Sequence, residues 1–135
     1  MNLNDPTLFP QIDISNYLAE IDGLPDQLEQ AWQLGNRLPL PEWRGLQRVV
    51  IAGMGGSAIG ADLLAAYAAP LCPLPLMVHR NYDLPAWASG PETLLVASSH
   101  SGNTEETLSA FQVGLARGCR ILTISTGGQL AERAR

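Results

Sequence analysis

The sequence predicts an α/β domain built on a doubly wound parallel sheet, and three observations support that prediction. Short, nearly continuous apolar segments have the length of buried strands rather than of helices. They alternate along the chain with segments of helical periodicity, as in parallel sheets that are covered on both faces. The first and third apolar segments run directly into loops of glycine and small hydroxyl residues. With right-handed crossovers, the expected strand order is flavodoxin-like, 2-1-3-4.

The composition limits the classes of function. The chain has 135 residues, of which 46% are hydrophobic and 16% charged, as expected for one ordinary globular domain. Its formal net charge of −5 and its lack of lysine argue against binding to nucleic acid. No run approaches the roughly 18 apolar residues of a membrane span, and the first residues lack the pattern of a signal peptide. We therefore expect a cytoplasmic protein with neither nucleic-acid nor membrane partners.

The two cysteines do not indicate a metal site. Cys72 and Cys119 lie far apart in apolar surroundings, without CxxC spacing. Free, buried thiols are the prediction for both. No metal site and no cofactor is expected.

Residues 1–47 are predicted to be a helical extension followed by a linker. Ser15 is placed to cap a short helix over 16–22, which Gly23 would end. Pro25 suits the first turn of a second helix, which would run to about residue 34. We expect this extension to precede the α/β domain of residues 48–135.

Strands and helices alternate from residue 48 onward. The predicted strands are 48–52, 75–79, 94–98 and 120–125, and the predicted helices are 58–69, 104–116 and a last one from 129. A fifth strand would be expected next, because otherwise strand four is a bare sheet edge. The domain is therefore expected to be incomplete at its C-terminus.

The stretch from Thr93 to Thr107 contains the strongest functional signal. A buried strand ends in the loop SSHSGNT, and a helix follows at once. Asn103 stands three residues before Glu106, the spacing of a capping box. Helix N-termini carry unpaired N–H groups and partial positive charge, so such a loop predicts an anion site. With hydroxyls but no lysine or arginine, the site suits the phosphate of a metabolite that must be released again.

A second loop, Gly53–Ser57, follows the first strand. In an open parallel sheet of the predicted order, strands one and three flank the point where the strand order reverses, and ligands bind there. Both loops, Gly53–Ser57 and Ser99–Thr104, are therefore expected to face one crevice. Ordinary turn chemistry is the alternative for each loop taken alone.

A dinucleotide-binding domain is a further alternative. The run GMGGSA fits the GxGxxG/A fingerprint. That fingerprint expects an acid at the end of the second strand, where this chain has His79 and Arg80. Arg80 could instead contact the extra phosphate of NADP.

GMGGSAIG, SSHSGNTEET and STGGQLAERA together resemble the SIS (sugar isomerase) domain, most closely the N-terminal part of the bifunctional phosphoglucose/phosphomannose isomerase family. The resemblance implies that a sugar phosphate contacts the chain through two groups of residues in the loops. Those expected to bind its phosphate are Ser57, Ser99, Ser101 and Thr104, and those expected to offer backbone contacts are Gly55, Gly56, Gly102 and Asn103. His100 departs from the family pattern, which has Tyr, and is expected to be packed or solvated.

The family interconverts fructose 6-phosphate with glucose 6-phosphate and mannose 6-phosphate through an enediol, and its members are dimers. By resemblance, the family's catalytic residues lie beyond this chain, which is therefore expected to bind without catalysing. The acids nearest the loops, Glu105, Glu106 and Asp62, are weak candidates for a base. A phosphosugar-sensing SIS module is the alternative from another functional class.

Overall fold

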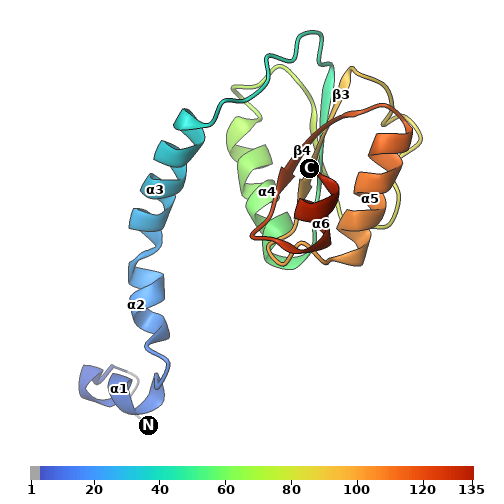
Figure 1. Cartoon of the computed structure of the whole chain (residues 1–135). Coiled ribbons are helices and arrows are strands. Elements are labelled where there is room, and N and C mark those ends of the chain that lie inside the picture. Colours follow the sequence, from blue (N-terminus) through green and yellow to red (C-terminus); the bar gives the residue numbers. More distant parts are fainter. Residues whose placement is uncertain (1–3) are drawn as a thin grey trace. The chain divides into compact units, whose positions relative to one another are not determined.

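The computed structural model describes residues 4–135, and these divide into two compact units (Figure 1). One unit ends at Glu42, and the other runs from Trp43 to Arg135. The first unit is helical. Its elements are a 3₁₀ helix η1 (Pro6–Leu8), α1 (Phe9–Ile12), α2 (Tyr17–Asp22) and α3 (Leu24–Arg37).

Asp13, not Ser15, caps α2. One carboxylate oxygen of Asp13 accepts a hydrogen bond from the Tyr17 N–H at 2.7 Å, and the other accepts one from the Leu18 N–H at 2.7 Å. The prediction that Ser15 caps this helix is therefore wrong, because a longer reach lets one carboxylate satisfy two unpaired donors. These hydrogen bonds, first that from Leu18 and then that from Tyr17, lower the pKa of Asp13 below its usual value.

The second unit is a parallel α/β domain. Its four strands are β1 (Arg48–Ala52), β2 (Leu76–His79), β3 (Thr93–Ser98) and β4 (Arg120–Ile124). All neighbouring strands are parallel, and the order is β2-β1-β3-β4, as predicted. The helices are α4 (Gly55–Ala68), α5 (Glu105–Ala116) and α6 (Gly128–Arg133).

Helix α4 begins three residues earlier than expected. The N–H of Ala58 already bonds to the Met54 carbonyl, so Gly55 and Gly56 form the first helical turn rather than a loop. In Figure 1, α4 and α5 lie on opposite sides of the sheet. The core between the sheet and α5 contains Val50, Ala52, Leu84, Ala88, Leu95 and Ala110, all buried.

The segment 80–92 between β2 and β3 contains no helix, yet it is held firmly. Its Leu84 and Ala88 supply the core just described. The Arg117 guanidinium donates to the carbonyls of Leu84, Pro85 and Ala88. This segment therefore takes the place of a crossover helix on the α5 side of the sheet.

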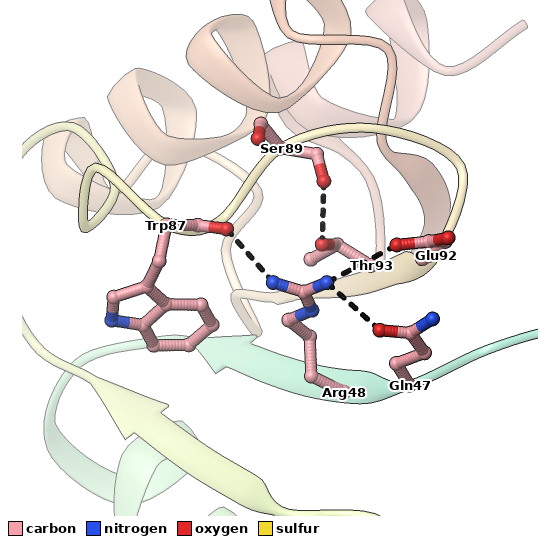
Figure 2. A network of polar contacts seen from close by, with 6 residues as sticks. All are labelled: Gln47, Arg48, Trp87, Ser89, Glu92 and Thr93. Atoms are coloured by element: carbon pink, nitrogen blue, oxygen red, sulfur yellow. Dashed lines mark hydrogen bonds and ion pairs between the residues drawn. The ribbon is translucent and has the colours of Figure 1, made fainter.

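Arg48 fastens the same segment to the start of β1 (Figure 2). Its guanidinium donates to the Trp87 carbonyl at 3.2 Å and pairs with the Glu92 carboxylate at 3.3 Å. The Thr93 hydroxyl donates to the Ser89 carbonyl at 2.8 Å beside this network. The network lies at the amino end of the strands, opposite the edge where the two predicted loops emerge.

Both cysteines are free thiols, as predicted, although each is half-buried rather than fully buried. Burial raises the pKa of the Cys119 thiol above its usual value.

Candidate functional site

The two predicted loops meet in one depression at the carboxyl edge of the sheet. Its volume is about 500 Å³, and it lies where β1 leads into α4 and β3 leads into α5. It is lined by Met54, Gly56, Ser57, His100, Ser101 and Thr104. The first N–H groups of a helix have no partner within that helix, so two helix N-termini offer donors around this space.

A second depression adjoins the first and extends toward β4. Its volume is about 240 Å³, and it shares Ser57 and His100 with the first. Its complete lining is Ser57, Ser98, His100, Ile124, Ser125 and Thr126. Together the two depressions form a crevice across the ends of β1, β3 and β4, and we refer to them jointly as the crevice.

Ser99 lies beneath the loop rather than on the crevice wall. It is only 2% exposed. Its hydroxyl lies 2.8 Å from the Thr104 hydroxyl and accepts a hydrogen bond from the Gly102 N–H at 3.1 Å. Ser99 therefore shapes the loop and orients Thr104, and its direct contact with a ligand stays a prediction.

Ser101 is exposed at the crevice, and its neighbour Gly102 makes that position possible. Gly102 has a φ of +68°, and a Cβ at this position would lie 1.8 Å from the Gly127 carbonyl oxygen. The Leu130 N–H donates to the Gly102 carbonyl at 2.9 Å. The loop after β3 is thus packed, backbone against backbone, on the loop after β4.

Asn103 does not form the predicted capping box with Glu106. Thr104 is the N-cap residue of α5, and no side chain caps that helix. The Asn103 amide nitrogen donates to the Ser101 carbonyl, and its oxygen accepts from the Gln129 N–H. The Asn103 side chain therefore caps the start of α6, because the tertiary fold places the Gln129 N–H within hydrogen-bond distance of it.

The two glycines in the first turn of α4 have open space where a side chain would lie. A Cβ at Gly55 or Gly56 would meet nothing within 4 Å, and Gly55 has a φ of +51°. The predicted approach of a ligand to this backbone is therefore sterically open. Direct contact by either glycine stays a prediction.

The acids named as weak candidates for a base are not among the residues that line the crevice. Asp62 forms an ion pair with Arg80. Glu105 accepts a hydrogen bond from the Tyr82 hydroxyl at 3.0 Å. That bond, followed by the charges of Glu105 and Glu106, raises the pKa of Tyr82 above its usual value.

The sequence analysis did not predict two groups of residues that line the crevice. His100, expected to be packed or solvated, lines both depressions. Ser125 and Thr126 enter from the loop after β4, and Thr126 donates from both its N–H and its hydroxyl to the His100 carbonyl. The motif STGG after the fourth strand was the available signal, since neighbouring parallel strands end at the same sheet edge.

Within residues 4–135, no cluster of three or more His, Cys, Asp or Glu residues is arranged to hold a metal ion. No helix in the described part of the chain is both long and apolar enough to cross a membrane.

Several known proteins are similar to this chain. No family model matches the chain. A bifunctional phosphoglucose/phosphomannose isomerase from Caldicellulosiruptor bescii is 46% identical over 112 residues, which are 82% of this chain and 33% of that protein. Proteins of the same name from Thermoplasma acidophilum and Aquifex aeolicus are 41% and 38% identical, over 62% and 64% of this chain and 26% and 27% of theirs.

The crystal structure of tagatose-6-phosphate ketose/aldose isomerase from Escherichia coli is also similar. The TM-score is 0.55 and the sequence identity 25%, over 87% of this chain and 32% of that one. The chain thus spans about a third or less of the length of the proteins that it matches. The predicted resemblance is confirmed: the chain has a SIS-like α/β fold and is a relative of the bifunctional phosphoglucose/phosphomannose isomerases over about a third of their length.

Proposed function

We propose that the crevice binds the phosphate group of a hexose 6-phosphate. This binding would contribute to an aldose–ketose isomerisation that interconverts fructose 6-phosphate with glucose 6-phosphate and mannose 6-phosphate. One observation carries the proposal. Three hydroxyl residues line one depression at which two helices begin: Ser57 in the first turn of α4, and Ser101 and Thr104 in the loop after β3. The names of the relatives supply the substrate class.

The chemistry of the lining suits a phosphate that must be released. Among the described residues, no lysine or arginine lines either depression, so an anion would be held by hydroxyl groups, helical N–H groups and His100. Hydrogen bonds from neutral donors to a charged oxygen contribute about 1.5–3 kcal/mol each. Three or four of them can hold a phosphate without a formal ion pair. The adjoining depression, with Ser125 and Thr126, then offers polar groups to the sugar hydroxyls.

We further propose that this chain alone binds without isomerising. Moving a proton between neighbouring carbons needs a positioned base, which contributes typically ~10²–10⁴-fold to the rate. Within the described part of the chain no carboxylate lines the crevice. Asp62 forms an ion pair with Arg80, and Glu105 accepts a hydrogen bond from Tyr82. A coupled assay for glucose 6-phosphate formed from fructose 6-phosphate should give no turnover, with the Caldicellulosiruptor bescii relative as positive control. Turnover that is lost on changing His100, Glu105 or Glu106 would contradict this assignment.

A binding titration tests the site itself. Fructose 6-phosphate should bind with a dissociation constant near ~1 mM, about 4 kcal/mol, as followed by NMR chemical shifts. Ser57→Ala and Ser101→Ala should each weaken binding roughly tenfold or more. Ser89→Ala is the matched control, because Ser89 lies beside the network at the opposite end of the strands. Equal binding by all four proteins would exclude this crevice as the phosphate site.

We also infer that the chain's macromolecular partner is a second copy of itself, rather than nucleic acid or a membrane. The formal net charge of −5 opposes contact with a phosphate backbone. Strand β4 is an edge of the described sheet, and Ile124 on it is 55% exposed. A cytoplasmic location accords with a protein that acts on phosphorylated sugars.

A further inference from the structure

Glu105 is a negatively charged residue close to the predicted anion site, where its charge would oppose the binding of phosphate. It is the first residue of α5 and directly follows Thr104, which lines the crevice. Its own carboxylate, however, is not part of the lining. Instead, it accepts a hydrogen bond from the Tyr82 hydroxyl at 3.0 Å. Tyr82 lies in the segment 80–92, just past the carboxyl end of β2.

A second pair of contacts shows which side of α5 this is. The Asp83 N–H donates to the Ser109 hydroxyl at 2.9 Å, and that hydroxyl lies 3.3 Å from the Asp83 carboxylate. Residues four apart in a helix lie on the same face, so Glu105 and Ser109 both face the segment 80–92. Two successive residues of that segment therefore bind two successive turns of α5. The carboxylate of Glu105 is held on this side of the helix.

The position of this carboxylate matters because, among the described residues, no lysine or arginine lines the crevice and could offset its charge. If Glu105 were released, rotation of its side chain could bring a negative charge toward a phosphate held beside Thr104. Like charges on a partly exposed surface repel by a few tenths to about 1 kcal/mol, a two- to fivefold change in affinity.

We propose that Tyr82 is a positioning residue of the anion site: its hydroxyl holds the Glu105 carboxylate on the face of α5 that meets the segment 80–92, and so preserves the affinity of the crevice for phosphate. The inference rests on the phosphate binding proposed above. The raised pKa of Tyr82 agrees with it, since a neighbouring carboxylate that accepts the phenolic hydrogen disfavours the phenolate. In this proposal the Glu105 carboxylate is held away from the bound phosphate and does not act as a catalytic base.

A double-mutant cycle tests the proposal, with inorganic phosphate and fructose 6-phosphate as ligands at low ionic strength. Tyr82→Phe should weaken the binding of both about two- to fivefold. Glu105→Gln should bind at least as tightly as the parent. The double variant should bind like Glu105→Gln alone, because no charge is left to restrain. Added salt should shrink the effect of Tyr82→Phe, since the repulsion is screened.

Tyr67→Phe is the matched control, because Tyr67 is 72% exposed on α4 and should leave binding unchanged. An unchanged affinity in Tyr82→Phe, or a loss that persists in the Glu105→Gln background, would overturn the proposal. If Ser101→Ala loses binding while Tyr82→Phe does not, only this inference fails. If neither parent nor variants bind phosphate, the proposed function fails with it.

Absorbance titration of the tyrosines gives a readout independent of ligand. The chain has three tyrosines, Tyr17, Tyr67 and Tyr82. Tyr82 should ionise at a lower pH in Glu105→Gln than in the parent, because the charge that disfavours its phenolate is lost. A titration identical in both proteins would show that the pair does not form in solution, and would overturn the proposal.

Discussion

The side-chain oxygen of Asn103 accepts a hydrogen bond from the Gln129 N–H at 3.1 Å, which joins the loop after β3 to the first turn of α6. The Asn103 amide nitrogen holds the Ser101 carbonyl at 3.2 Å at the same time. One side chain thus couples the start of α6 to Ser101, the exposed serine of the predicted phosphate loop. A substitution of Asn103 should therefore affect both the stability of α6 and the shape of the crevice.

Asn103→Ala should therefore reduce both stability and binding. Loss of a helix cap costs about 0.5–2 kcal/mol, which urea unfolding can measure. Faster hydrogen exchange at the Gln129 amide would locate the loss. Asn103→Asp keeps an acceptor for that amide and is the matched control, which should retain most of the stability. Equal protection of Gln129 in the parent and in Asn103→Ala would contradict the cap.

Gly102→Ala should be far more destabilising than Gly118→Ala. Both glycines have a left-handed φ, +68° and +69°, so alanine strains either site by about 1–2 kcal/mol. Only at Gly102 would the new Cβ run into backbone, 1.8 Å from the Gly127 oxygen, which adds roughly 1–3 kcal/mol. Thermal and urea unfolding of the two variants provide the comparison. Equal losses would mean that the two loops do not pack as described.

Ser99→Ala and Ser101→Ala should distinguish a residue that stabilises the loop from one that binds the phosphate. Ser99 is buried, and its removal deprives the Thr104 hydroxyl of its partner, which should cost about 1–3 kcal/mol of stability as well as affinity. Ser101 is exposed, and its hydroxyl accepts only a surface hydrogen bond from the Asn103 N–H, so Ser101→Ala should lose affinity with a smaller change in stability, about 0.5 kcal/mol. Urea unfolding combined with a fructose 6-phosphate titration distinguishes them. A Ser99→Ala protein as stable as the parent would contradict the supporting role.

Acid should loosen the start of α2. The pKa of Asp13 is lowered in the folded chain by hydrogen bonds from Leu18 and Tyr17. A lowered folded pKa contributes stability that is present above the unfolded value, about 3.9, and is lost as pH falls through the folded pKa. NMR titration should show the Tyr17 and Leu18 amides shifting together below that value. Asp13→Ala should abolish the shift, whereas Asp26→Ala, on the next helix, should leave it intact.

Association of the chain should depend on the β4 edge. Ile124 is 55% exposed there, and an exposed apolar edge strand favours pairing with a second copy. Sedimentation velocity should show a dimer or larger species, which Ile124→Lys weakens. Ile14→Lys is the control, since Ile14 is 90% exposed in the other unit. A monomer at high concentration in the parent protein would contradict the prediction.

Local pattern was enough to predict the sheet. Apolar runs such as Val49–Ala52 and Leu94–Ala97 are too short for helices and too apolar for loops, and the topology rules leave few orders for four parallel strands. The motifs then led to the crevice, because loops that follow neighbouring parallel strands must emerge at one edge. Helix starts were less predictable. Gly55 and Gly56 read as a turn by propensity, yet they form the first turn of α4.

The sequence by itself determined the strand order, the edge that bears the crevice and the relationship to the sugar isomerases, since these depend on periodicity and on short contiguous motifs. Only the tertiary structure decided what each polar side chain in the loops contacts. Ser99 bonds to Thr104, Asn103 to the start of α6 and Glu105 to Tyr82, 23 residues earlier in the chain. A side chain satisfies whichever donor or acceptor lies within about 3 Å, and for Asn103 and Glu105 the packing of distant segments sets that distance.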